Sequence, residues 1–370
     1  MADEAARMKA DVVIVGAGPG GMSAAAALSG NGLKTVVVER LSEAGVRRYH
    51  SVCGEAVSER SFSRLGWRPG SIAAEVSSIS ISIPGGPGVR IRAKGAIVDR
   101  PGMLSELRAM SDAEFITASA QSVSEDGGGY IVGLSDGRSI RTEWLIGADG
   151  AHSIVRKAVF GRGPTDRIRL VNCIAEGDGG SDLSFFVEQA HAGGYGWRFP
   201  SHPGRVSVGF PVGTCDPRTL DIESWGARDL PFGVLDEVAR GRCLLVGDAA
   251  CLANPLCYGG IAAAMISGKK AAEAVLSGDP DGYGRWIARD PMFDRRFMDA
   301  HRAFCGWTDD EISDALAPFR RGPVMLCGLY AMIRRPKWAR IYFSVFMGLR
   351  YGWRCCPIVS SRPEYWMQLA

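Results

Sequence analysis

With 370 residues, the chain is long enough for two or three structural units, and 46% hydrophobic with 22% charged residues is typical of an ordinary globular protein. A net charge of +3 is too small to indicate a nucleic-acid-binding protein, so we expect no nucleic-acid partner. The 10 cysteines contain no C-x-x-C pair and the 5 histidines no zinc-like spacing, so we expect no metal site and interpret most cysteines as small buried residues.

The N-terminus carries acidic residues and lacks the apolar core of a signal peptide. No stretch reaches the roughly 20 apolar residues that a transmembrane helix needs. We therefore expect a cytoplasmic protein that is soluble or peripheral at the membrane.

Residues 11–40 have the pattern of a buried strand, a glycine turn, a helix and a second strand. Gly16, Gly18 and Gly21 supply G-x-G-x-x-G, which allows a tight turn, backbone approach to a pyrophosphate and close packing of helix on strand. Glu39, at the end of the second strand, can accept hydrogen bonds from ribose hydroxyls and would repel a 2′-phosphate. The combination predicts a site for FAD or NAD rather than NADP.

Two later transitions from strand to loop distinguish between these cofactors. An apolar strand within 143–161 enters a D-G pair at Asp149 and Gly150, and a helix follows. A second apolar strand enters a G-D pair at Gly247 and Asp248. NAD dehydrogenases need neither pair. The order of G-x-G-x-x-G, D-G and G-D resembles the FAD-binding chains of the p-hydroxybenzoate hydroxylase-like superfamily.

The resemblance implies how the G-D segment would meet a flavin. Asp248 would hydrogen-bond the ribityl chain, whereas taken alone it could be the N-cap of an alanine-rich core helix. The loop from Pro255 to Gly260 would lie along the isoalloxazine, and the helix from about Ile261 would direct its dipole at the flavin N1/C2 carbonyl. The expected cofactor-binding residues are Gly16, Gly18, Gly21, Glu39, Arg40, Cys53, Gly54, Arg100, Ala120, Asp149, Gly150, Gly247, Asp248, Pro255, Gly259, Gly260 and Ile261.

Further motifs are similar to those of the geranylgeranyl reductase family. Residues 52–67 resemble its Cys-Gly-Glu segment, 193–200 its Tyr-x-Trp-x-Phe-Pro signature, and 254–279 its Pro-x-x-Gly-Gly-Gly turn and following helix. The chain departs from the family at Tyr258, which replaces the first of the three glycines, and in the short interval 214–242. A shortened interval suggests a reshaped or more open substrate cavity.

The resemblance implies saturation of an isoprenoid double bond, which needs a hydride from the flavin, a proton donor and a dry apolar site. Cys53 would lie near the flavin as donor or gate, with a buried structural thiol as the alternative. Tyr258 is a second catalytic candidate, although its ordinary pKa of about 10 makes it a sluggish acid. Tyr195 and Trp197 would share one strand face and contact the substrate together with Cys257, unless the two rings are ordinary core aromatics.

We predict an α/β fold in which a mostly antiparallel β-sheet substrate domain is inserted into a Rossmann-like FAD-binding domain, with a C-terminal helical region. Residues 320–370 hold nine Lys or Arg against one Glu, with aromatic residues interspersed. This suits either a segment on an anionic membrane surface or a solvated cap over the substrate cavity. The expected domains are 8–70, 96–165 and 238–285 for FAD binding, 71–95 and 166–237 for the substrate sheet, and 286–370 for a basic-aromatic helical cap.

The chain has no second nucleotide-binding fingerprint, so the electron donor must be external: a ferredoxin, a deazaflavin or NAD(P)H. The leading interpretation is an FAD-dependent reductase of carbon–carbon double bonds in a geranylgeranyl-type isoprenoid lipid or prenyl chain, acting in lipid biosynthesis. One alternative is a flavin-dependent monooxygenase or halogenase acting on an aromatic or tethered small molecule. Another is a flavoprotein without turnover that binds a lipid or a partner.

Overall fold

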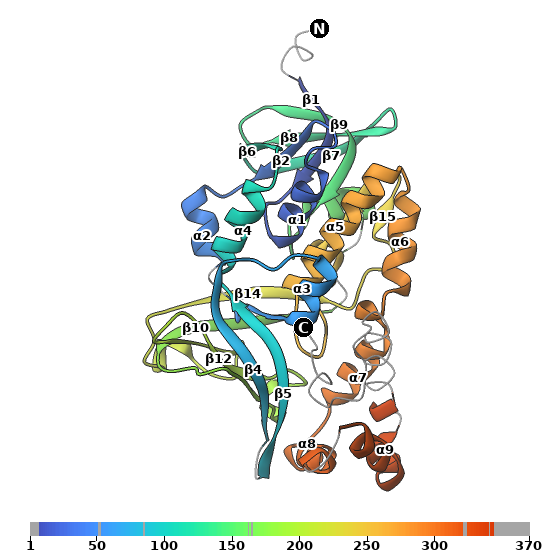
Figure 1. Ribbon diagram of the computed structural model, residues 1–370. Helices are drawn as coiled ribbons and strands as arrows, with labels where there is room; N and C mark the ends of the chain where they lie inside the picture. The colour runs from blue at the N-terminus through green and yellow to red at the C-terminus, as the bar shows by residue number, and fades with distance from the viewer. Residues whose placement is uncertain are drawn as a thin grey trace.

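The computed structural model describes residues 7–50, 53–83, 86–161, 163, 166–320, 324–339 and 341–343. Within these residues the chain forms two eight-stranded sheets, with helices packed around the first and extending beside the second (Figure 1). The predicted α/β class, with one sheet added to a dinucleotide-binding sheet and a C-terminal helical region, is confirmed.

The first sheet has a parallel centre in the order β16-β9-β1-β2-β6. Val12, Val13 and Ile14 of β1 are fully buried, so both faces of the sheet are covered at this strand. Antiparallel strands β7, β8 and β15 extend it. The bounds are β1 Arg7–Val15, β2 Thr35–Glu39, β6 Glu114–Thr117, β7 Ala120–Asp126, β8 Gly129–Leu134, β9 Ser139–Gly147, β15 Ala239–Arg240 and β16 Cys243–Leu245.

Helices α1 (Pro19–Leu28) and α5 (Ile261–Ser277) pack on each other through small residues. A Cβ placed on Gly268 of α5 would lie 2.0 Å from the carbonyl oxygen of Gly20 in α1. The Ser23 hydroxyl donates a hydrogen bond of 2.8 Å to the carbonyl of Met265 across the same interface. The two backbones therefore touch, which only glycine and other small side chains allow.

The second sheet runs in the order β14-β10-β13-β12-β11-β4-β5-β3 and is antiparallel except where β11 pairs with β4. Residues 56–58, which we assigned to the FAD-binding domain, pair in this sheet with residues 95–97, as parts of β3 and β5. A Cβ on Gly95 would lie 2.4 Å from the Val57 carbonyl, so glycine permits this pairing. The bounds are β3 Ala56–Ser58, β4 Ile72–Ile83, β5 Gly86–Val98, β10 Asp166–Glu176, β11 Asp182–Phe186, β12 Gly196–Pro200, β13 Arg205–Pro211 and β14 Ser224–Phe232.

The C-terminal helices lie beside the second sheet, away from the first (Figure 1). Met298 of α7 packs into the apolar cluster of that sheet with Phe232 and Tyr258. No helix in the described part of the chain is long and apolar enough to cross a bilayer. Much of the basic-aromatic stretch, from residue 344 onward, lies outside the described residues. The remaining helices are α2 Glu43–His50, α3 Glu59–Leu65, α4 Arg100–Ala109, α6 Pro280–Arg289, α7 Arg296–Phe304, α8 Asp309–Leu316 and α9 Val324–Arg334.

The α1–α5 contact predicts opposite effects for two glycine substitutions within helices. Gly268→Ala should lower the free energy of unfolding by about 1–3 kcal/mol, since its Cβ overlaps the Gly20 carbonyl. Gly284→Ala in α6 should raise it by about 0.5–1 kcal/mol, because the nearest atom to its Cβ would be 3.8 Å away. Urea unfolding of both variants measures the difference. Equal stabilisation by both would contradict the close contact.

Candidate active site

A cavity of about 860 Å³ is lined by residues of both sheets. One end is formed by the loops after β1, β2, β9 and β16, which converge because the carboxyl ends of parallel strands meet at one edge. The other end is walled by aromatic residues of the second sheet. We call the polar end formed by these loops the cradle and the end walled by aromatic residues the chamber; both are parts of one cavity.

The structure brings nearly all predicted site residues to this cavity. Gly21 and Pro255 do not line it. A Cβ on Gly21 would lie 1.9 Å from the Gly16 carbonyl, so Gly21 serves the packing of the turn. Pro255 lies just before the segment that lines the cavity, which begins at Leu256. The predicted residues that line it are Gly16, Gly18, Glu39, Arg40, Cys53, Gly54, Arg100, Ala120, Asp149, Gly150, Tyr195, Trp197, Gly247, Asp248, Cys257, Tyr258, Gly259, Gly260 and Ile261.

The glycine turn leaves its cavity face free of side chains. Gly16 has a φ of +104°, which favours glycine, and a Cβ there would lie 2.3 Å from the Ala148 carbonyl. The Glu39 carboxylate accepts hydrogen bonds from the backbone N–H of Ala17 at 2.8 Å and of Leu41 at 2.9 Å. Glu39 therefore holds the turn in shape while facing the cavity.

Arg156 ties the D-G loop to the G-D loop. Its buried guanidinium donates hydrogen bonds to the carbonyls of Ala151 at 2.6 Å and Ala249 at 2.9 Å. Asp149 accepts from the N–H of Ile154 at 2.7 Å with one carboxylate oxygen, and its other oxygen is buried without a hydrogen-bond partner in the described residues. Sequence reasoning expected a helix after the D-G pair but did not predict this link.

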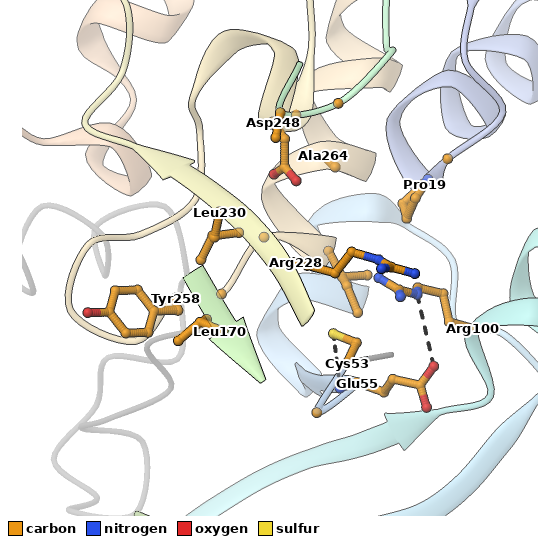
Figure 2. A pocket seen from close by; sticks show the side chains of 18 of the residues that line it. Pro19, Cys53, Glu55, Arg100, Leu170, Arg228, Leu230, Asp248, Tyr258 and Ala264 are labelled. Atoms are coloured by element: carbon orange, nitrogen blue, oxygen red, sulfur yellow. Dashed lines mark hydrogen bonds and ion pairs between the residues drawn. The ribbon is translucent and has the colours of Figure 1, made fainter. Parts of the chain in front are cut away.

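Asp248 lies where the D-G and G-D loops meet, and its side chain lines the cavity (Figure 2). Burial raises its pKa to about 6, although Arg100 and Arg156 favour the charged carboxylate. An orphaned oxygen on Asp149, a buried acid at Asp248 and a turn without side chains are features that fit the hydroxyls and phosphates of a dinucleotide.

Glu55 is a site residue that sequence reasoning did not assign, although the Cys-Gly-Glu motif contained it. Its carboxylate lies 3.9 Å from Arg100 Nε in an ion pair that is almost fully buried (Figure 2). Burial raises the pKa of Glu55 to about 7, against the opposing effect of Arg100. The neighbouring Cys53 Sγ accepts a hydrogen bond from the Glu55 N–H at 3.4 Å, and burial raises the pKa of this thiol.

Arg228, on β14, is a second residue that sequence reasoning missed. Its side chain lines the cavity (Figure 2), and its guanidinium lies 4.2 Å from the centre of the Tyr49 ring. It donates a hydrogen bond of 2.9 Å to the Ala227 carbonyl. β14 lies in the interval 214–242. The length of this interval did not indicate that one of its residues would place a positive charge at the cavity.

The apolar chamber has a wall of interlocking rings. Tyr195 stacks on Tyr258 with ring centres 5.1 Å apart, and Phe185 meets Tyr195 edge-on at 4.9 Å. The Tyr195 hydroxyl donates to the Cys257 carbonyl, and the Trp197 indole N–H donates to Ser207 Oγ at 3.3 Å. Because these polar groups are satisfied by protein, the rings present apolar surface to the cavity.

Tyr258 occupies a backbone position that suits glycine, with a φ of +50°. The sequence departs from the family glycine here, yet the backbone keeps a left-handed conformation. The Tyr258 side chain lies across the site from Cys53 and Glu55 (Figure 2). Its buried hydroxyl has no hydrogen-bond partner among the described residues, and burial raises its pKa.

Comparisons with known proteins agree with this geometry. Residues 9–65 match the family model described as an FAD binding domain. The chain is 28% identical to digeranylgeranylglycerophospholipid reductase 1 of Methanopyrus kandleri, over 73% of this chain and 81% of that protein.

Solved structures share the fold. A geranylgeranyl bacteriochlorophyll reductase-like protein of Thermoplasma acidophilum superposes with a TM-score of 0.75 at 21% identity, covering 93% of this chain and 99% of that one. HpxO of Klebsiella pneumoniae, crystallised with FAD, gives a TM-score of 0.59 at 19% identity, covering 94% and 100%. The match of residues 9–65 to an FAD binding domain identifies FAD as the cofactor.

The buried Glu55 predicts a pH dependence of stability. Its pKa is raised from 4.5 to about 7 on folding, so the folded state binds more protons than the unfolded state in this interval. The stability that Glu55 contributes is therefore lost as the pH rises through about 7. Because one pKa unit corresponds to about 1.4 kcal/mol, the wild type should lose about 3 kcal/mol of unfolding free energy that Glu55→Gln does not lose.

Chemical unfolding from pH 4 to 8, at matched flavin content, measures the effect. Asp248 titrates in both proteins, so the difference between them isolates Glu55. Parallel stability profiles for the two proteins would contradict a raised pKa at this position.

Proposed function

We propose that this FAD-dependent oxidoreductase, which is similar to digeranylgeranylglycerophospholipid reductases, saturates carbon–carbon double bonds of a geranylgeranyl-type isoprenoid lipid or prenyl chain. The observation that carries this proposal is the continuity of the polar cradle with a chamber walled by Tyr195, Trp197 and Phe185. An apolar pocket with few polar groups suits a hydrocarbon chain. Bound FAD supplies the hydride for such a reduction.

In this proposal, different residues of the cradle bind different parts of FAD. The turn at Gly16 and Gly18 and the N-terminus of α1 would hold the diphosphate, and Glu39 would hold the adenosine ribose. Asp248 would bind the ribityl chain. The N-terminus of α5 would face the carbonyl side of the ring, where its dipole stabilises negative charge.

Cys53 is the proton donor that the geometry favours. Burial raises the pKa of its thiol, so the proton stays on sulfur at neutral pH. Glu55, with a pKa of about 7 and a backbone N–H bonded to Cys53 Sγ, can return a proton after turnover. Tyr258 lies across the site and is a weaker acid than free tyrosine, so we assign it to the chamber wall.

Electrons would reach the flavin from an external donor: a ferredoxin, a deazaflavin or NAD(P)H. The chain carries one G-x-G-x-x-G turn, and that turn belongs to the FAD cradle.

Anaerobic reoxidation of the reduced flavin tests the reaction. The FAD-loaded protein is reduced chemically and mixed with a geranylgeranyl phospholipid, and flavin absorbance and lipid mass are followed together. We expect flavin reoxidation with two hydrogens gained per flavin oxidised. Inertness toward the lipid would contradict the proposal. Rapid, substrate-stimulated reaction with oxygen to a hydroxylated or halogenated aromatic product would support the monooxygenase or halogenase instead.

Substitution of Cys53 tests the proton donor separately. Cys53→Ser should retain FAD and slow alkene reduction at least about tenfold, because a serine hydroxyl is a far weaker acid. The matched control is Cys215→Ser, an exposed free cysteine. Single-turnover rates of flavin oxidation by the lipid measure the effect. A wild-type rate in Cys53→Ser would remove Cys53 from the mechanism.

A further inference from the structure

Helix α9 turns four large apolar side chains toward solvent. The exposed fractions are 63%, 46%, 51% and 79% for Leu326, Leu329, Tyr330 and Ile333, respectively. Their spacing of i, i+3, i+4 and i+7 places them on one helix face. The smaller Cys327 and Ala331 are buried instead. A helix on the surface of a water-soluble domain has the opposite arrangement, with its large apolar residues inward.

These residues form a concentrated patch rather than scattered surface residues. Of the ten large hydrophobic side chains that are exposed in the described part of the chain, four lie in these eight positions. Phe343, 50% exposed, follows shortly after the helix. Isolated exposed apolar residues need no explanation, whereas a contiguous group marks an interaction surface.

An exposed arginine borders the apolar face of α9 formed by Leu326, Leu329, Tyr330 and Ile333, which we call the α9 face. The Arg334 guanidinium lies 5.5 Å from the centre of the Tyr330 ring, at the edge of the face. Asp314, a nearby carboxylate, is paired with Arg335 at 2.6 Å. Residues 320–370 carry nine Lys or Arg and a single Glu. Apolar side chains bordered by cations complement a surface that is apolar within and negatively charged outside.

We propose that the α9 face, formed by Leu326, Leu329, Tyr330 and Ile333, docks on the surface of an anionic lipid bilayer. The apolar side chains enter the boundary between headgroups and acyl chains, and basic residues contact lipid phosphates. A second copy of the chain would bring its own Arg334 against the same edge of the face, like charge against like charge, so it fits the face less well.

Docking at α9 would orient the whole molecule. α9 lies at the end of the molecule that contains the second sheet, far from the first sheet (Figure 1). The half of the protein with the aromatic chamber would therefore stand nearer the bilayer than the FAD-binding half. The proposal concerns binding alone and does not depend on which reaction the site catalyses.

Co-sedimentation with vesicles tests the proposal on the full-length, FAD-loaded protein. The vesicles contain either phosphatidylcholine alone or phosphatidylcholine with phosphatidylglycerol. We expect binding to the anionic vesicles that weakens at high salt, and a loss of at least about tenfold in the partition coefficient of Leu326→Glu/Ile333→Glu.

The matched control is Val212→Glu/Trp225→Glu, which adds the same charge at two side chains that are each 52% exposed on the second-sheet half. This control should bind like the wild type. Flavin content and thermal unfolding of both variants establish that they are folded.

Three results would overturn the proposal. The first is wild-type protein that stays in the supernatant with anionic vesicles, and the second is equal binding by the α9 variant and its control. The third is a change of mass in light scattering caused by the α9 substitutions while vesicle binding is unchanged, which would make the face a contact between copies.

Discussion

The backbone contact between α1 and α5 determines where the parts of the site meet. No side chain separates the two helices at Gly20 and Gly268. Because α1 begins after the glycine turn and α5 after the G-D loop, this contact brings both helix N-termini, at Pro19 and Ile261, to one cavity. A dinucleotide places phosphates and a ring system some distance apart, and the helix pair sets that distance. Larger residues at the contact would separate the two ends.

The site also depends on a division between charge and hydrocarbon. Arg100 favours the charged form of the buried Glu55 carboxylate, and Arg100 and Arg156 together favour that of Asp248. Burial nevertheless raises the pKa of Glu55 to about 7 and that of Asp248 to about 6. On the other side of the cavity the Tyr195 hydroxyl and the Trp197 indole N–H bond to protein atoms, which leaves the apolar faces of these rings toward the cavity. A single cavity can then accept a charged cofactor at one end and a lipid chain at the other.

The sequence predicted those parts of the structure whose signal lies in contiguous residues. The glycine turn, the acid that ends β2 and the start of α5 each occupy one short segment, so pattern and spacing sufficed. The link from Arg156 to Ala249 joins residues 93 apart in the chain, and β3 is only three residues long, so neither gave a readable signal. Arg228 and the buried state of Glu55 depend on packing between the two sheets. At Tyr258 the sequence departed from the family glycine, whereas the backbone kept the conformation that glycine favours.

In the proposed reaction, flavin and lipid occupy one continuous cavity. Titration of the oxidised, FAD-loaded protein with a detergent-dispersed geranylgeranyl lipid, without any reductant, measures whether they do. Because the chamber opens onto the cradle, the flavin absorption bands should shift in proportion to the lipid bound, with binding measured independently by equilibrium dialysis of labelled lipid. Saturable lipid binding that leaves the flavin spectrum unchanged would contradict a shared cavity.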